Sequence, residues 1–356
     1  TNMRNPSKKR YLNAITHQDM AEIPFQENQV DISHINRVLG TDYALATRSY
    51  EMAPEHQVQF AMRLGNDMVY VASLWELGRK VSLDENGRKH YVDGEIKTRD
   101  DFKKIIEPDL GEFERRIDGV LEHAAGTGLG VIVAVQHVPK LVTVAMGYQD
   151  YMLALLDTPD FVKEFQQRCA DYCHRELEMV LSKPIDVVQT PVDMCMQSGP
   201  MYSPDILEEY EFPWLRHTLQ RAKAAQKATI LHIDGYFVDL IPTFIDMGVD
   251  IINPVEPCAN QDIVDLKRQF GDQLAFQGNL NVASVLAVLS PEDVYEKARA
   301  LAEAMAPGGG FILASSHDIG ENIPWENVLA MRDAATTFRK AGLTKSPLPS
   351  GWVRKV

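Results

Sequence analysis

Long hydrophobic runs are missing from this chain of 356 residues. No apolar stretch approaches the roughly 20 residues that cross a bilayer as a helix. The start, Thr1-Asn-Met-Arg-Asn-Pro, also has no apolar core of the kind found in signal peptides. We therefore expect no membrane attachment and a cytoplasmic location.

Positive charge and cysteine are scarce as well. Lys and Arg number 36 against 50 Asp and Glu, which gives a formal net charge of -14. Such an excess of acid argues against nucleic acid or an anionic membrane as the main partner. The four cysteines do not make a disulfide framework in a chain of this length. Cys169 and Cys173, one turn apart on a predicted helix, fit buried apolar packing better than a metal site.

A glycine-rich phosphate loop is absent too. The cluster Gly308-Gly-Gly310 precedes a predicted strand, whereas a phosphate loop follows a strand and opens a helix. A nucleotide-binding function therefore has little support. The remaining composition, 45% hydrophobic and 24% charged, is that of an ordinary globular protein that can bury a core.

Three apolar runs that end in polar residues organise the chain. They span residues 229–235, 249–258 and 310–318, and their polar ends hold His232, Asp234, Glu256, Cys258 and His317. Short β-rich runs separated by helix-length segments predict parallel strands joined by helical crossovers. In such folds ligands bind beyond the carboxyl ends of the strands, so we expect these side chains to converge.

Eight runs in all have the length and composition of strands. They span residues 23–27, 67–72, 131–137, 185–193, 229–235, 249–258, 273–279 and 310–317. Helix-length segments fill most of the gaps between them. This count predicts an α/β fold, a single (β/α)8 TIM barrel that forms one domain over residues 1–356.

Local signals place the other elements. Residues 4–20 form a predicted N-terminal helical segment, and residues 148–181 read as one long amphipathic stretch. Ser203 and Ser290, each followed by Pro, are predicted N-caps. Asn-Gly between alternating segments predicts a β-hairpin excursion at residues 80–92.

One side chain near each strand end would face the mouth of such a barrel. The eight are Glu27, Glu76, His137, Asp193, His232, Glu256, Asn279 and His317. Catalytic groups of (β/α)8 barrels come from the ends of several strands, so this ring is the predicted active site.

His232 and Asp234 are two residues apart, so on an extended segment their side chains project to the same side. Such a pair fits two adjacent ligands of one metal ion. A catalytic zinc ion takes three protein ligands, and Glu256, Cys258 and His317 are candidates for the third. Taken alone, a His beside an Asp is more often a hydrogen-bonded structural pair, so both interpretations stay open.

Structural roles compete with functional ones at the other strand ends. Asp193 fits a loop or a helix cap as well as a functional carboxylate. Glu27 and Glu76 fit salt bridges as well as substrate binding. Met196 fits an apolar wall for a flat ligand, but it fits a gap-filling core residue better.

The chain resembles the uroporphyrinogen decarboxylase superfamily and, within it, the corrinoid-dependent methyltransferases. The residues that carry the resemblance are Ser203-Pro-Asp-Ile, the turn after His232, residues 248–255, residues 270–279, and residues 307–317 with Pro324-Trp-Glu-Asn327. The similarity is strongest over residues 186–331. It implies a barrel fold and an enzyme.

The chain departs from the tetrapyrrole decarboxylase itself at the first predicted strand. The family's decarboxylases have an arginine-rich segment there, which meets the many carboxylates of their substrate. Residues 24–37 of this chain hold acids, with Arg37 as the single arginine. An acidic mouth would repel such a substrate.

The chain also departs from the methyltransferase relatives, which bind zinc through a His-x-Cys pair and a later Cys and use it to activate a thiol. His232 is kept, but Asp234 stands at the first Cys position, and Ser315, Ser316 and His317 surround the second. Oxygen ligands in place of thiolates change the expected chemistry. This departure argues against methylation of a thiol and leaves the presence of zinc open.

The expected function is methyl transfer between a small methylated donor and the cobalt of a corrinoid, with O-demethylation of an aryl methyl ether as the favoured reaction. His232, Asp234 and His317 could relay a proton or, with Glu256 or Cys258, hold a metal that polarises the leaving oxygen.

Further residues have expected roles in binding. Asp193 and Asn279 could orient the substrate, with Asp193 also a catalytic candidate. Phe25, Trp75 and Met196 are candidates for an apolar wall. The other candidates for substrate binding are Glu27, Glu76 and His137.

The corrinoid is expected on a separate protein, because the cobalamin-binding pattern D-x-H-x-x-G does not occur in the chain. That partner would dock over the barrel mouth. Relatives of this fold often pair as homodimers, so a homodimer is a further expectation. Two other functions stay open: a decarboxylase of a smaller carboxylic acid, and a binding protein without catalysis.

Overall fold

A parallel sheet of seven strands forms the centre of the computed structural model, which describes residues 4–18, 20–73 and 75–338. The strands are β1 (Met68–Ala72), β4 (Gly130–Ala134), β5 (Val187–Val192), β8 (Ala228–Ile233), β9 (Ile251–Pro254), β10 (Ala275–Leu280) and β11 (Phe311–Ser315). They lie in this order across the sheet, so each strand pairs with the next one along the chain. All six pairings are parallel, and one of them sets His232 beside Asn253.

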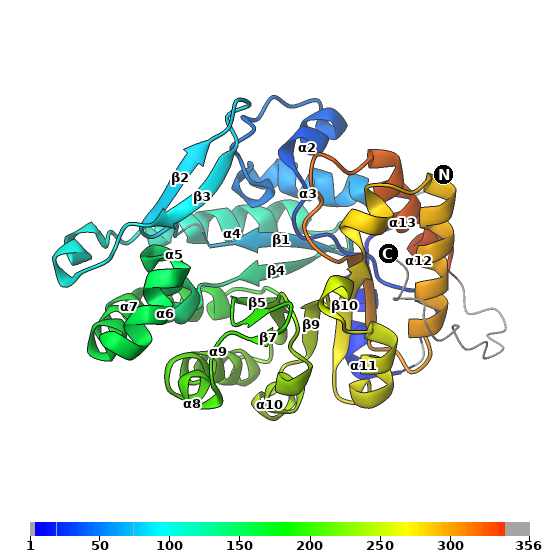
Figure 1. Ribbon diagram of the computed structural model, residues 1–356. Helices are drawn as coiled ribbons and strands as arrows, with labels where there is room; N and C mark the ends of the chain where they lie inside the picture. The colour runs from blue at the N-terminus through cyan, green and yellow to red at the C-terminus, as the bar shows by residue number, and fades with distance from the viewer. Residues whose placement is uncertain (1–3, 19, 74, 339–356) are drawn as a thin grey trace.

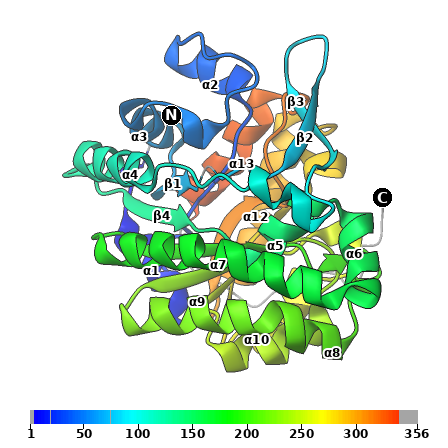
Figure 2. The same ribbon diagram turned by 90° about the vertical axis from the view of Figure 1, so that its left-hand side faces the viewer.

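Helices surround this curled sheet, as Figures 1 and 2 show. They are α1 (Lys8–Asn13), α2 (Ile32–Leu39), α3 (Pro54–Leu64), α4 (Leu110–Ala124), α5 (Val138–Met146), α6 (Tyr148–Asp157), α7 (Pro159–Ser182), α8 (Pro204–Ile206), α9 (Phe212–Ala224), α10 (Ile241–Met247), α11 (Ile263–Phe270), α12 (Pro291–Met305) and α13 (Trp325–Thr337). Every residue of β1, β4, β9, β10 and β11 is buried, as expected of strands covered on both faces. None of the described helices is long and apolar enough to cross a membrane.

The first of the eight predicted strands is formed only in part. Phe25 makes an isolated parallel bridge to Leu313, and the Leu313 N–H donates to the Pro24 carbonyl at 3.0 Å. On the other side, the Asp67 N–H donates to the Phe25 carbonyl at 3.1 Å. The segment therefore lies between β11 and β1. It forms no longer ladder because Pro24 has no N–H to donate toward β11, and on the side of β1 the Glu27 N–H donates to a side chain, Asn66 Oδ1.

Prolines interrupt the predicted amphipathic stretch 148–181 and the helical segment that begins after the predicted N-cap Ser203. The stretch 148–181 consists of α6 and α7, with Pro159 at the first position of α7. The helix that begins after Ser203 contains a π-helical turn over Leu207–Glu211 before α9. Pro213 follows that turn and has no N–H to donate back along the helix, which accounts for the wider turn. The predicted N-cap at Ser203 is confirmed, since its side chain accepts a hydrogen bond from the Ile206 N–H.

The predicted hairpin is confirmed as β2 (Arg79–Leu83) and β3 (Lys89–Gly94), which project from the body of the protein in Figures 1 and 2. Gly87 adopts a φ of +81°, which the turn requires and which glycine tolerates. The Asp84 carboxylate accepts hydrogen bonds from the Asn86 and Arg88 N–H groups and closes the turn.

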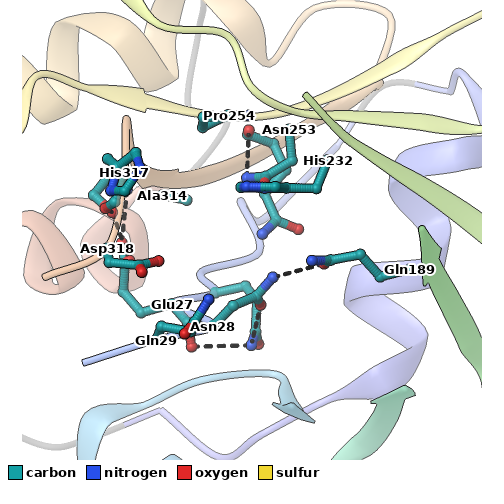
Figure 3. A pocket seen from close by; sticks show the side chains of 13 residues that line it. Glu27, Asn28, Gln29, Gln189, His232, Asn253, Pro254, Ala314, His317 and Asp318 are labelled. Carbon is teal, nitrogen blue, oxygen red and sulfur yellow. Dashed lines mark hydrogen bonds between the residues drawn. The ribbon is translucent and has the colours of Figure 1, made fainter. Parts of the chain in front are cut away.

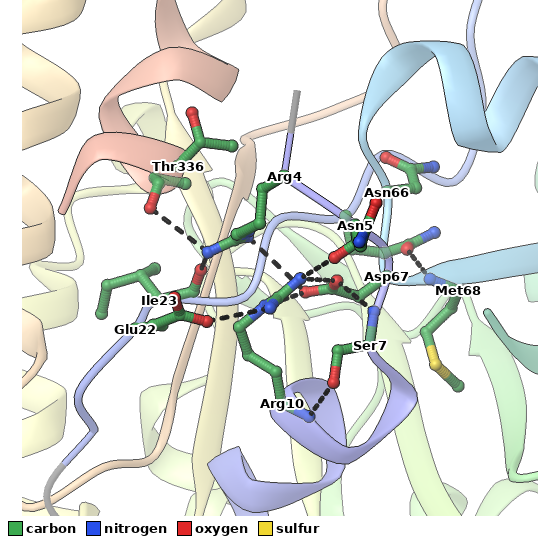
Figure 4. Close-up of polar contacts among 12 residues, drawn as sticks. Arg4, Asn5, Ser7, Arg10, Glu22, Ile23, Asn66, Asp67, Met68 and Thr336 are labelled. Atoms are coloured by element: carbon green, nitrogen blue, oxygen red, sulfur yellow. Dashed lines mark hydrogen bonds and ion pairs between the residues drawn. The ribbon is translucent and has the colours of Figure 1, made fainter. Parts of the chain in front are cut away.

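The N-terminal segment is shorter than predicted, with α1 followed by a 3-10 turn at Ala14–Thr16. It is attached to the foot of β1 through Asp67, whose side chain is fully buried. Asp67 accepts hydrogen bonds from the Ser7 N–H at 2.9 Å and from Arg10 Nε at 3.0 Å (Figure 4). The buried Tyr11 hydroxyl donates to Gln277 Oε1 inside the sheet.

Candidate functional site

A small cavity opens at the carboxyl ends of the strands, and polar side chains form most of its lining (Figure 3). Six of them are amides, namely Gln26, Asn28, Gln29, Gln189, Asn253 and Gln277. The other lining residues are the polar Glu27, Asp318, His232, His317 and Ser315 and the apolar Ala314 and Pro254. The cavity volume is about 20 Å³, which exceeds the roughly 10–15 Å³ that one ordered water needs. The predicted convergence of strand ends therefore holds for Glu27, His232 and His317.

His232, on β8, is held in one orientation by its neighbour on β9. Its Nδ1 lies 2.7 Å from Asn253 Oδ1, and Asn253 Nδ2 donates to the Gln277 carbonyl at 3.1 Å. Because the Asn253 oxygen can only accept, His232 Nδ1 carries the proton of this bond. The other ring nitrogen, Nε2, is thereby free to exchange a proton with a group at the mouth.

Asp234 stands between the two imidazoles of the site. One of its oxygens, Oδ2, lies 3.7 Å from His232 Nε2 and 4.0 Å from His317 Nε2. Its other oxygen, Oδ1, is buried without a hydrogen-bond partner. His317 is half exposed and His232 mostly buried, so the three groups lead from solvent into the cavity.

Glu27 is a buried carboxyl group in the wall of the cavity. Desolvation raises its pKa to about 8, and the charge of Asp318 acts in the same direction. Two hydrogen bonds from Ser315, one from its N–H and one from its hydroxyl, each at 2.6 Å, oppose that rise. Glu27 is therefore mainly protonated at neutral pH and can donate a proton.

Asp318 is a functional candidate that the sequence did not single out. Its side chain reaches solvent at the mouth, yet protein surrounds it closely enough that desolvation raises its pKa. The nearby imidazoles of His317 and His232 lower the pKa, and Asp234 raises it further. Two carboxyl groups of the cavity thus favour the protonated form more than free acids do.

Asp193 lies just after β5 in an ionic cluster near the cavity. Burial favours its protonated form, but the Lys140 ammonium at 3.0 Å and the Tyr148 hydroxyl at 2.8 Å hold its pKa below the usual range. His232 also contributes to this lowering. Asp193 is therefore a stable anion behind His232, not a proton donor.

Two of the candidate metal ligands, Glu256 and Cys258, do not join His232, Asp234 and His317. Glu256 accepts a hydrogen bond from the Gly235 N–H at 2.8 Å, and Cys258 is exposed beside Gln197. In the part of the chain that the structure describes, no group of three or more His, Cys, Asp or Glu side chains could hold a metal ion. The donor set as placed does not fit zinc.

Two predicted binding residues, Trp75 and Glu76, lie in structural contacts outside the cavity lining. Trp75 is buried, donates to the Ile106 carbonyl at 3.0 Å and packs edge-on against Tyr172. Glu76 pairs with Arg48 at 3.0 Å. These contacts show that a strand-end position alone does not bring a side chain into the cavity.

The remaining predicted binding residues are also outside the lining. His137 is buried with its Nε2 3.3 Å from Glu211. Asn279, on β10, donates to the Val255 carbonyl at 3.0 Å. Met196 is exposed on the small hairpin of β6 (Cys195–Met196) and β7 (Gly199–Pro200). Their roles in substrate binding stay predictions.

Amides inside strands are the part of the site that the sequence analysis missed. Gln189, Asn253 and Gln277 all lie in buried strands, with Gln189 only 3% exposed. A buried amide is costly unless it is hydrogen-bonded, so an amide within an apolar run signals an interior polar site. The sequence contains that signal, but the predicted site residues were chosen at the ends of strands and not within them.

A family comparison agrees with this architecture. The sequence profile described as "Uroporphyrinogen decarboxylase (URO-D)" matches residues 6–338, nearly the whole chain. The chain belongs to the uroporphyrinogen decarboxylase family. The predicted superfamily is thereby confirmed.

Two known proteins match the chain over different lengths. Uroporphyrinogen decarboxylase from strains of Coxiella burnetii is 34% identical over 77 residues, which cover 22% of this chain and 21% of that protein. A methyltransferase from Methanosarcina mazei superposes with a TM-score of 0.70 at 16% identity, covering 94% of this chain and 99% of the other. At that identity the superposition shows a shared fold.

Proposed function

We propose that this member of the uroporphyrinogen decarboxylase family is a methyltransferase. In this proposal a small donor carries the methyl group on oxygen, and a corrinoid on a separate protein accepts it. The fold shared with the Methanosarcina mazei methyltransferase supports the proposal.

The charged and titratable groups of the cavity lining are the main support for the proposal. The lining contains two carboxyl groups and two imidazoles, Glu27, Asp318, His232 and His317, and no Lys or Arg among the described residues. A substrate with many carboxylates would meet no cation there. A donor whose oxygen must leave would instead meet groups that can protonate it.

Proton donation is the step for which Glu27 is best suited. When the bond between the methyl carbon and oxygen breaks, the electron pair stays on oxygen, which then needs a proton. Glu27, with its pKa near 8, holds a proton at neutral pH and can release it to an alcohol or phenol product. The docked corrinoid supplies the nucleophile that takes the methyl group.

His232, Asp234 and His317 can carry a proton to the cavity. Their spacing of 3.7 and 4.0 Å forms a path from exposed His317 through Asp234 to His232 at the cavity wall. A proton taken from solvent can thus reach the cavity wall at His232. No proton transfer in this scheme needs a zinc ion.

The cavity lining supports a donor that carries its methyl group on oxygen, but it does not support an aromatic donor in particular. The favoured donor in the sequence analysis was an aryl methyl ether, packed on Phe25, Trp75 and Met196. Phe25 and Trp75 are buried in the core, and none of the three lines the cavity. The proposal therefore keeps O-demethylation and does not require an aromatic wall.

The test mixes this protein with a reduced corrinoid protein and 2-methoxyphenol, and follows methylation of the corrinoid by its visible spectrum. Methylation that is lost in His232→Ala and kept in His123→Ala, an exposed position on α4, would support the proposal. Absence of methylation with methyl ethers, methanol and methylamines would refute it. Release of carbon dioxide from a small acid would then favour the decarboxylase that the Coxiella burnetii similarity suggests.

A further inference from the structure

An amide pair spans the cavity from one side of the sheet to the other. Asn28 follows the partial first strand, whereas Gln189 lies on β5. Asn28 Nδ2 donates to Gln189 Oε1 at 2.9 Å, and Gln26 Nε2 donates to Asn28 Oδ1 at 3.1 Å (Figure 3). The pair links segments that are separated by 161 residues in the sequence.

Burying the amide of Gln189 costs free energy of folding unless the amide is hydrogen-bonded. It sits in a strand whose neighbours are mostly Val, and it is 3% exposed. A buried amide without partners costs free energy, while a hydrophobic residue at this position would pack without that cost. Its polar partners are Asn28, on the segment after the partial first strand, and the Tyr70 hydroxyl on β1.

The groups missing from the lining exclude several kinds of donor. Among the described residues no Lys or Arg lines the cavity, so a carboxylate or phosphate on the donor has no cation to pair with. No described Phe, Tyr or Trp lines it either, so a quaternary ammonium has no cage of such rings. Amides remain, and each amide can both donate and accept a hydrogen bond.

A hydroxyl group matches such a pair, because it too donates and accepts. Inserted between Asn28 Nδ2 and Gln189 Oε1, a hydroxyl would accept from the first and donate to the second. Two hydrogen bonds would replace one, and both amides would stay satisfied. A donor without a hydroxyl offers no such exchange.

We infer that the methyl donor is a neutral methyl ether that also carries a free hydroxyl group, and that Gln189 and Asn28 determine this specificity. The inference rests on the proposed function and narrows its substrate class. A site built to bind a hydroxyl rejects an analogue that lacks it by a large factor, here expected to be at least roughly 10-fold.

Matched donors test the inference on the unchanged protein. The first pair is 2-methoxyethanol and 1-methoxypropane, and the second is 2-methoxyphenol and anisole. The second member of each pair has a methyl group or a hydrogen atom in place of the hydroxyl. We expect kcat/KM for corrinoid methylation to be at least roughly 10-fold higher for the hydroxylated member of each pair. We also expect 2-methoxybenzoate and tetramethylammonium to be poor donors.

Equal rates within each pair, or a preference for 2-methoxybenzoate or tetramethylammonium, would overturn the inference while leaving methyl transfer intact. Methylation by none of the donors would overturn the proposed function and this inference with it. The two failures therefore give different results.

Variants then assign the preference to the amide pair. In Gln189→Leu and in Asn28→Ala, the ratio of kcat/KM between paired donors should fall toward one. A merely structural defect would slow both donors and leave the ratio unchanged. Asn28 is only half buried, so Asn28→Ala remains informative if Gln189→Leu does not fold.

The matched control is Gln167→Leu, which removes an exposed amide on α7. It should keep the full ratio between paired donors. A ratio that stays high in both cavity variants would show that the amide pair does not select the donor.

Discussion

Glu27 keeps its proton at a pH where free glutamate has lost it, and this has a consequence for stability. Its pKa rises from 4.5 to about 8, chiefly through desolvation. Between these values the folded protein binds more protons at this site than the unfolded chain does. The contribution of Glu27 to the free energy of unfolding must therefore decrease as pH rises through that interval.

Glu27→Gln should remove this decrease, because a neutral amide has no proton to lose. Relative to the unchanged protein, we expect the variant to have similar stability near pH 5 and to gain on the order of 3 kcal/mol by pH 9. Urea unfolding at pH 5, 7 and 9 measures the difference. Glu112→Gln, at an exposed position on α4, is the control, and parallel curves for Glu27→Gln would contradict the assigned pKa.

The activity should fall over the same range if Glu27 donates the proton. With the group protonated below its pKa, kcat/KM for methyl transfer from an ether should decline as pH rises past about 8. Glu27→Gln should lose most activity, roughly 100-fold or more, at every pH. A pH–rate profile measures both effects, and an unchanged alkaline limb in the variant would assign the limb to another group.

For single residues, the sequence predicted the site only where a polar, reactive side chain lies at the end of a strand. His232, Asp234 and His317 were predicted from the spacing of polar residues after apolar runs, and the structure brings them together. Trp75 and His137 satisfied the same pattern but pack into the core. Sequence order gives the end of a strand, but not the direction in which the side chain leaves it.

The β2–β3 hairpin holds two of the loops that line the cavity. Arg88, in its turn, lies 3.4 Å from Asp31 and 2.5 Å from Glu321. Asp31 follows Gln29 in the same segment, and Glu321 follows Asp318. One guanidinium therefore ties together the two segments that carry cavity residues on that side.

Arg88→Ala should loosen these segments with a small loss of stability. The groups are partly exposed, so we expect the free energy of unfolding to decrease by about 1 kcal/mol. Hydrogen exchange should become faster in residues 29–32 and 318–322 than in the rest of the protein. Arg115→Ala, which removes an exposed ion pair with Asp109, is the control. Unchanged exchange in both segments would mean that the hairpin does not hold them.

Elements were predictable where local chemistry decides their boundaries. The hairpin turn and the Ser203 cap follow from side chains within a few residues, and both are confirmed. The partial first strand and the π-helical turn depend on where Pro24 and Pro213 withhold an N–H from a partner. Those partners are known only once the neighbouring segments are placed.

At the scale of the whole molecule, a buried ionic contact joins the N-terminal segment to the foot of the sheet. Asp67 is fully buried and accepts hydrogen bonds from Arg10 and Ser7, and Arg4 lies 3.7 Å away (Figure 4). Such a contact over 57 residues could not be predicted, because local patterns carry no information on which distant segments meet.

Asp67→Ala should be strongly destabilising, because it leaves the buried Arg10 charge without its main partner. We expect the free energy of unfolding to decrease by on the order of 3–5 kcal/mol. Thermal or urea unfolding measures the loss. Asp118→Ala, at an exposed ion pair with Lys183, should change stability by less than about 1 kcal/mol. Equal losses in the two variants would contradict the importance of the buried contact.

Cys258 offers an exposed thiol to which a chemical label can be attached. Cys169 and Cys173 are buried, whereas Cys258 is exposed two residues after Glu256. Burial and nearby carboxylates raise the pKa of Cys258, so its thiol reacts best in mildly alkaline solution. A fluorophore joined to Cys258 would sit close enough to Asp234 to report the arrival of a large partner at the mouth as a change in emission.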